Sequence, residues 1–121
     1  MEENKMNGEQ QDIMEFEKTR NHLINISGQK QQLQFQSTAM KDALEELEKT
    51  KEKKVYKAVG NILVLSTVEG VKKELTQQKE SADLRVKTLQ KQEDLTVEKL
   101  NKLRARLEAG SKPDKPEKEE K

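Results

Sequence analysis

Cysteine and tryptophan are absent from this chain, and aromatic residues make up only 2% of it. Without cysteine the chain can form no disulfide and no thiolate metal site, which fits a reducing compartment. The single histidine, His22, forms neither a metal site nor a catalytic dyad by itself, and we expect it to be an ordinary residue of a helix surface. These absences exclude disulfides, thiolate metal sites and any site that needs two histidines.

Long apolar runs and an excess of one charge are also missing. No stretch could span a bilayer, and the N-terminus lacks the apolar core of a signal peptide. The formal net charge is +1 with both signs interspersed, which offers no basic surface to a nucleic acid. No nucleophile-elbow, Walker or glycine-rich phosphate motif occurs. We therefore expect a soluble cytoplasmic protein that is not an enzyme, needs no cofactor or metal, and binds neither nucleic acid nor a membrane.

The hydrophobic content is too low for an ordinary globular core, with 31% hydrophobic and 39% charged residues. Such a chain is either disordered or an extended coiled coil. Long stretches of Gln, Glu, Lys and Leu with spaced apolar residues favour the coiled coil. The predicted fold class is mainly α.

Residues 55–66, with the sequence VYKAVGNILVLS, form the one segment dense in β-branched and aliphatic residues. Two apolar runs around Gly60 and Asn61 predict a β-hairpin in which Gly60 supplies the positive φ of the turn. In this register Val59 lies opposite Ile62 and both faces of the ribbon are mostly apolar. An isolated ribbon of this kind is marginally stable and has two unpaired edges.

We therefore interpret this segment as an oligomerisation hairpin that other chains complete. Its residues are Val55, Tyr56, Val59, Gly60, Asn61, Ile62, Leu63, Val64 and Leu65. The alternative is a hairpin that folds back onto its own helices.

Helices are predicted on both sides of the hairpin, over residues 12–53 and 67–109. They are nearly equal in length and joined by a compact hairpin, so they should return side by side as an antiparallel pair. Ser66 is predicted to cap the second helix by accepting a bond from the backbone of Glu69. Residues 1–11 should be a flexible N-terminus, although Asn7 offers a second possible helix start, and residues 110–121 should be a disordered charged tail.

Both helices carry a heptad seam for a partner helix. In the first helix it runs through positions 23, 26, 30, 33, 37, 40, 44 and 47. Toward the N-terminus the series Ile13, Phe16, Arg20, Leu23 predicts a slip of the heptad phase. In the second helix the predicted seam begins with Val71, Leu75, Gln78, Ala82, Arg85, Leu89, Gln92 and Thr96. It then shifts in phase and continues through Leu100, Leu103 and Leu107.

The order of these elements resembles a known family. A long helix ending in ALEELEK, then VYKAVGNILV, then a long helix containing LRVKTLQKQE is similar to the beta-class subunit of prefoldin, especially its archaeal form, over about residues 12–108. The VYK-x-V-G-N-hydrophobic segment is the specific part of this resemblance, because Gln-rich and Glu-rich coils are common to many proteins.

The resemblance implies a heterohexamer of two alpha-class and four beta-class subunits whose hairpins close into an oligomeric β-barrel body. It also implies an ATP-independent holdase that captures non-native polypeptides at the coiled-coil tips and passes them to a group II chaperonin. The alpha class has two hairpins between its helices, whereas this sequence has room for one. The charged tail is not part of the family pattern, and no role is transferred to it.

The residue pattern suggests the same location for a client, at the free end of the helical pair. We define the client-binding tip by the apolar residues of this end, namely Ile13, Met14, Phe16, Leu100, Leu103 and Leu107. Flexible Met and Leu surfaces suit partners of varied shape. The alternative is that these residues simply pack against one another in the seam.

Two other functions remain open at this stage. A structural coiled-coil adaptor would oligomerise through its hairpin and bind one specific partner helix along a continuous apolar stripe. A tubulin-binding cofactor or similar helical bundle is less consistent with the sequence, because nothing in such a bundle requires a two-faced hairpin.

Overall fold

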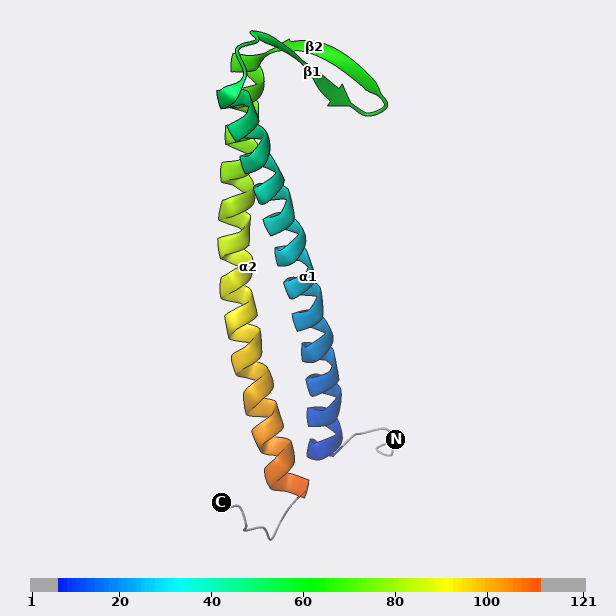
Figure 1. The fold of residues 1–121 in the computed structure, drawn as a ribbon. Helices are drawn as coiled ribbons and strands as arrows, with labels where there is room; N and C mark the ends of the chain where they lie inside the picture. Colours follow the sequence, from blue (N-terminus) through cyan, green and yellow to red (C-terminus); the bar gives the residue numbers. More distant parts are fainter. Residues whose placement is uncertain (1–6, 112–121) are drawn as a thin grey trace. The chain divides into compact units, whose positions relative to one another are not determined.

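Two long helices and one two-stranded sheet make up the fold. A computed structural model describes residues 7–111, in the order helix α1 (Gly8–Lys49), strand β1 (Lys54–Val59), strand β2 (Ile62–Thr67) and helix α2 (Val68–Ser111) (Figure 1). This confirms the predicted fold of two long helices with an antiparallel hairpin between them. Residues 1–6 and 112–121, which hold most of the predicted flexible N-terminus and charged tail, lie outside the described residues.

The chain divides into two compact units, which are described separately. The end unit combines residues 1–28 with residues 90–121, and the hairpin unit consists of residues 29–89. Both helices contribute to both units, whereas β1 and β2 belong to the hairpin unit alone. The hairpin and the predicted tip therefore fall in different units.

The start of α1 is fixed by a reciprocal side-chain cap. Asn7 Oδ1 accepts a hydrogen bond from the backbone N–H of Gln10 at 2.7 Å, and Gln10 Oε1 accepts one from the N–H of Asn7 at 3.2 Å. The helix therefore begins at Gly8 and not at Asp12, which was the other possible start in the sequence.

At its other end, α1 stops at Lys49, four residues before the predicted boundary. The N–H of Thr50 still bonds the carbonyl of Glu46 at 3.1 Å, and Thr50 Oγ1 then accepts a bond from the N–H of Glu52. Residues 51–54 are all charged, so they offer no apolar side chain to hold another helical turn. The carbonyl of Lys53 accepts a bond from the N–H of Val68 at 2.9 Å, which ties this linker to the start of α2.

Helix α2 is capped by Thr67 and not by Ser66, so the predicted cap was wrong. Thr67 Oγ1 accepts a hydrogen bond from the N–H of Gly70 at 3.0 Å, whereas Ser66 still pairs with Val55 in the sheet. The sheet therefore extends further than expected, and the next hydroxyl along the chain caps the helix. A Cβ atom on Gly70 would lie 2.9 Å from Thr67 Oγ1, so a larger residue there would displace the capping hydroxyl.

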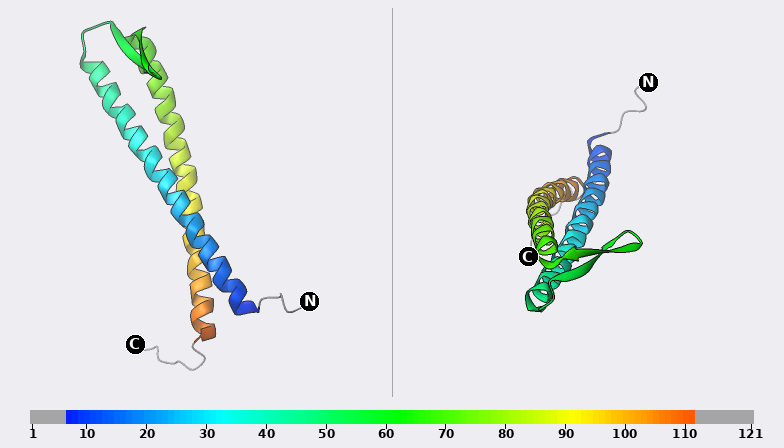
Figure 2. Two further views of the ribbon diagram at one scale, coloured as in Figure 1. Left: turned by 90° about the vertical axis from the view of Figure 1, so that its right-hand side faces the viewer. Right: turned by 90° about the horizontal axis from the view of Figure 1, so that it is seen from above.

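The hairpin has the predicted register. Val59 pairs with Ile62 and Lys57 with Val64, and Gly60 occupies the turn with φ of 60°. This left-handed conformation is one that glycine adopts without strain. The view from above in Figure 2 shows the ribbon extending sideways from the ends of the two helices that it joins.

The seam of α1 follows an unbroken alternation of three-residue and four-residue steps, so the predicted phase slip is wrong. Thr19 is 5% exposed and takes the position expected for Arg20, while Ile13 lies off the seam on the exposed side. A threonine can fill a buried position with its methyl group, but a search for apolar residues overlooks it. The seam consists of Asp12, Phe16, Thr19, Leu23, Ile26, Lys30, Leu33, Ser37, Met40, Leu44 and Leu47.

In α2 the predicted series also needs correction. Gln78, Arg85 and Gln92 are exposed, and the residues that follow each of them are the half-buried ones. When these following residues are assigned to the seam, the heptad repeat continues to Leu107 with no shift of phase. The apolar Val86 then occupies the seam position that was predicted for Arg85. The seam of α2 consists of Val68, Lys72, Leu75, Lys79, Ala82, Val86, Leu89, Glu93, Thr96, Leu100, Leu103 and Leu107.

The two helices are antiparallel within each unit, as bonds between their side chains show. In the hairpin unit Ser37 hydrogen-bonds Asp83, and Lys72 lies 3.0 Å from Glu48. In the end unit Ser27 hydrogen-bonds Glu93, and further bonds join residues nearer the helix ends. In both units, residues later in α1 pair with residues earlier in α2. This antiparallel pairing is the one predicted for two helices joined by a compact hairpin.

The core is thin. The buried apolar residues of the described chain are Ile26, Val68, Ala82, Leu89 and Leu103, and its buried polar residues are Thr19, Ser37 and Thr96. Thr96 satisfies its hydroxyl by donating to the carbonyl of Gln92 at 2.7 Å. Two-stranded coiled coils gain their stability from apolar residues in the seam. Burial of so few apolar residues therefore contributes little to the free energy of unfolding of this helix pair.

The corrected register predicts different effects for two neighbouring alanine substitutions. Val86→Ala removes two methyl groups from the seam and should lower the free energy of unfolding by about 1 kcal/mol. Arg85→Ala changes an exposed position and should stay within about 0.5 kcal/mol. Urea unfolding followed by circular dichroism measures both free energies. A larger loss of stability for Arg85→Ala than for Val86→Ala would support the seam first predicted, in which Arg85 and not Val86 is a seam residue.

Candidate functional site

The predicted oligomerisation hairpin is largely uncovered. Tyr56 and Leu63, on one face, are each 69% exposed, and the neighbouring Leu65 is more than half exposed. On the other face Val59, Ile62 and Val64 are also exposed, while Val55 is half-buried. A ribbon with two apolar faces and two open edges is a surface that another protein chain can cover.

The two faces of the hairpin differ in their relation to α2. Lys57 Nζ donates to both carboxylate oxygens of Glu74, at 2.7 and 2.9 Å. Lys57 shares its face with the half-buried Val55 and Ser66, so this face is turned toward α2 near the base of the ribbon. The face that carries Tyr56 and Leu63 has no such contact among the described residues, and it is the more exposed of the two.

The predicted client-binding tip separates into covered and uncovered residues, all of them in the end unit. Met14 is 57% exposed and Ile13 45% exposed, whereas Leu103 is only 3% exposed. Phe16, Leu100 and Leu107 are half-buried. The structure therefore brings the six residues to the same end of the helices, but four of them take part in the seam.

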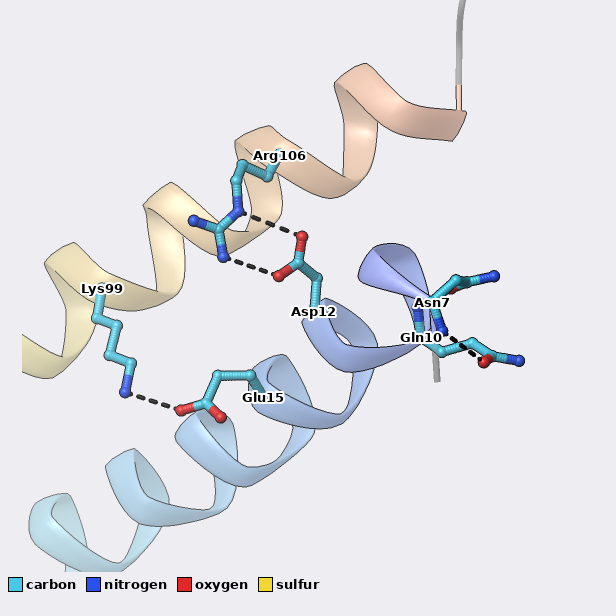
Figure 3. A network of polar contacts seen from close by, with 6 residues as sticks. All are labelled: Asn7, Gln10, Asp12, Glu15, Lys99 and Arg106. Carbon is cyan, nitrogen blue, oxygen red and sulfur yellow. Dashed lines mark hydrogen bonds and ion pairs between the residues drawn. The ribbon is translucent and has the colours of Figure 1, made fainter. Parts of the chain in front are cut away.

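Two ion pairs join the helices at this end (Figure 3). Arg106 donates to both carboxylate oxygens of Asp12, from Nη2 at 2.8 Å and from Nε at 3.2 Å. Lys99 Nζ donates to Glu15 at 2.9 Å. The hydrogen bond and the positive charge of Lys99 hold the pKa of the Glu15 carboxyl below its ordinary value of 4.5.

Sequence reasoning missed these pairs, although a signal for them exists. The first turns of α1 carry Glu9, Asp12 and Glu15, and the last turns of α2 carry Lys99, Lys102 and Arg106. Opposite charges at the two helix ends predict contacts between them as soon as the helices are known to be antiparallel.

Similar polar contacts continue along the seam in the hairpin unit. Lys79 and Ser37 both donate to Asp83, and these bonds, that of Lys79 first, hold the pKa of its carboxyl below the ordinary value. A hydrogen bond to Glu48 raises the pKa of Lys72. These bonds satisfy polar groups in and beside the seam. The bonds Ser37–Asp83 and Glu48–Lys72 join α1 to α2, whereas Lys79 and Asp83 both belong to α2.

The described residues offer little to a small ligand. Their grooves are open, and His22 lies in one of them beside Glu15, Lys18 and Lys99. Between residues 7 and 111 no cluster of acidic or histidine side chains could hold a metal ion. No helix in that range is long and apolar enough to cross a membrane.

Comparison with known proteins decides the family. The family model described as "Prefoldin subunit" matches residues 10–112. The chain belongs to the prefoldin family. Prefoldins are chaperones.

Individual prefoldins resemble the chain over most of its length. The prefoldin subunit beta of Archaeoglobus fulgidus is 38% identical over 97 residues, which cover 79% of this chain and 84% of that protein. The prefoldin subunit beta of Pyrococcus furiosus is 33% identical over 100 residues, which cover 82% and 86%. The crystal structure of the prefoldin beta subunit from Thermococcus strain KS-1 superimposes with a TM-score of 0.76 at 30% identity, covering 88% of this chain and 95% of that one.

The lowered pKa of Glu15 predicts a pH-dependent contribution to the stability of this prefoldin. Because the folded pKa lies below the unfolded one, the contribution is complete above about pH 4.5 and is lost as the pH falls through the folded value. Wild type should melt at a higher temperature than Glu15→Gln at neutral pH, and the two should converge in acid.

Thermal unfolding across the pH range measures this difference. Glu17→Gln is the control, since among the described contacts Glu17 pairs with Arg20 of its own helix at 3.6 Å and with no residue of α2. A difference between wild type and Glu15→Gln that persists undiminished in acid would contradict the assignment.

Proposed function

We propose that this prefoldin acts as a beta-class subunit of an ATP-independent holdase. In this proposal it assembles in the cytoplasm with an alpha-class subunit, as two alpha and four beta chains whose hairpins close into a β-barrel body. Its coiled-coil ends capture non-native polypeptides and pass them to a group II chaperonin. The observation that carries the proposal is the single uncovered hairpin between two long helices, together with similarity to several archaeal prefoldin beta subunits.

The exposed hairpin supports assembly through β1 and β2. Among the described residues its apolar side chains remain exposed, and the helices do not cover them. Removal of this apolar surface from water favours association with other hairpins, and strand pairing would satisfy the open edges. This accounts for both faces at once, which a hairpin packed on its own helices does not.

The distribution of exposed apolar residues along the helices favours a holdase over an adaptor. A partner helix needs apolar anchors repeated every three or four residues on one face. In the end unit, Ile13 and Met14 are adjacent, but the next exposed apolar residue of α1 is Ile24, three turns away. Between them the helix surface is polar, so it offers no continuous stripe to a specific partner helix.

Charges placed in the hairpin test the proposed assembly. Val59→Asp combined with Ile62→Asp should abolish oligomers and leave most of the helical content, because carboxylates would lie where neighbouring hairpins pack. Light scattering and circular dichroism measure the two effects. The matched control carries Gln77→Asp and Gln78→Asp on the exposed side of α2, and it should assemble like wild type. Unchanged assembly of the hairpin variant would refute this interface.

Serine substitutions test the proposed client-binding tip. Ile13→Ser with Met14→Ser removes exposed apolar surface at the helix ends, and roughly fivefold more chaperone should be needed to suppress aggregation of reduced lysozyme. Assembly should be unaffected. Ile24→Ser with Leu95→Ser removes comparable exposed surface elsewhere in the end unit and is the control. Equal loss in both variants would show that capture is not confined to the tip.

A further inference from the structure

Part of the proposed client-binding tip is closed in this structure. Leu103 is buried to 3% exposure, and Phe16 and Leu107 are half-buried. A single helix cannot bury a leucine to this extent, because each of its side chains has neighbours on only one side. Leu103 must therefore be covered by α1, and a client can contact it only if the two helices separate at this end.

The ion pairs between the helices lie on either side of Leu103. Lys99 precedes Leu103 by four residues and Arg106 follows it by three, so both side chains are one helical turn away from it. Their partners Glu15 and Asp12 lie on α1 beside Phe16. Four charged side chains thus join the two helices (Figure 3), within one helical turn of the apolar residues that the proposed function assigns to clients.

We propose that the pairs Asp12–Arg106 and Glu15–Lys99 form an ionic latch that controls access to the client-binding tip. With the latch closed, Leu103 is buried and Phe16 is half-buried, so Ile13 and Met14 are the most exposed residues of the tip. When the latch opens, the ends separate and the apolar surface grows to include the seam residues. This inference rests on the proposed holdase function and names the regulation of its client site.

The strength of the latch suits such a role. Asp12 and Arg106 make a two-point contact, which is the stronger geometry for a carboxylate and a guanidinium. Both pairs are nevertheless partly exposed to solvent, so salt screens them and each stabilises only weakly. The latch therefore favours the closed end without preventing its opening by thermal motion.

The experiment compares two variants that lose the same number of charges from the same end of α1. Asp12→Asn with Glu15→Gln removes both acidic partners of the latch. Glu9→Gln with Glu17→Gln removes two acidic residues that make no bond to α2 among the described contacts. A charge reversal, Asp12→Arg with Arg106→Asp, re-creates one pair in the opposite orientation.

Hydrogen exchange of the full chain reports whether the end opens. The latch variant should exchange the amides of residues 99–107 about two to five times faster than wild type, while the control and the charge reversal should exchange at nearly the wild-type rate. Sodium chloride should accelerate exchange in wild type and have little effect in the latch variant. Equal exchange in all variants would overturn the latch.

Suppression of the aggregation of reduced lysozyme reports whether opening controls capture. It is measured for the full chain alone and mixed with an archaeal alpha-class prefoldin subunit. The latch variant should reach half-suppression at a concentration about two to five times lower than wild type. Faster exchange with unchanged suppression would overturn the proposed control and leave the holdase function intact. A wild-type chain that suppresses nothing in either form would overturn both.

Discussion

The structure depends, in each of its two units, on the contact between α1 and α2. The seam residues repeat regularly along each helix, and they include nearly every residue that the helices bury. Polar and charged side chains fill several of its positions, among them Thr19, Ser37 and Glu93, whereas the apolar Phe35 and Leu84 lie outside it and are exposed. The seam therefore buries few apolar residues, and the hairpin and the residues near the helix ends keep much of their apolar surface exposed.

The small buried core accounts for the position of the candidate sites. The apolar side chains of the hairpin are exposed among the described residues, so in the proposed assembly its faces are available to other prefoldin subunits. Only its base is held, by Lys57 and Glu74, which turn one face toward α2. At the helix ends, charged residues close the seam where apolar ones would otherwise be exposed. In the proposed assembly, burial of the hairpin by other subunits would add to the stability of each subunit.

The element order and the hairpin could be predicted from the sequence because their signals are local. Gly60 and Asn61 between two apolar runs specify the turn, and the turn length fixes the pairing of Val59 with Ile62. The resemblance to prefoldin rested on the same segment. The relative lengths of the helices were enough to predict an antiparallel pair.

The errors lay where two positions in the sequence compete for one role. Asn7 or Asp12 could begin α1, and Ser66 or Thr67 could cap α2; hydrogen-bond geometry decided for Asn7 and Thr67. In the seam, a search for apolar residues overlooked Thr19. The ion pairs of the helix ends depend on contacts between residues far apart in the sequence, so they could be found only after the pairing of the helices was known.

Hydrogen exchange of the hairpin tests the central claim most directly, namely that β1 and β2 are covered by other subunits. The amides of residues 54–67 would be followed as the concentration of the chain rises, with and without an archaeal alpha-class prefoldin subunit. The account predicts weak protection in the dilute chain and strong protection once subunits associate. Strong protection that is already complete in a monomer, and that does not change when the second subunit is added, would contradict it.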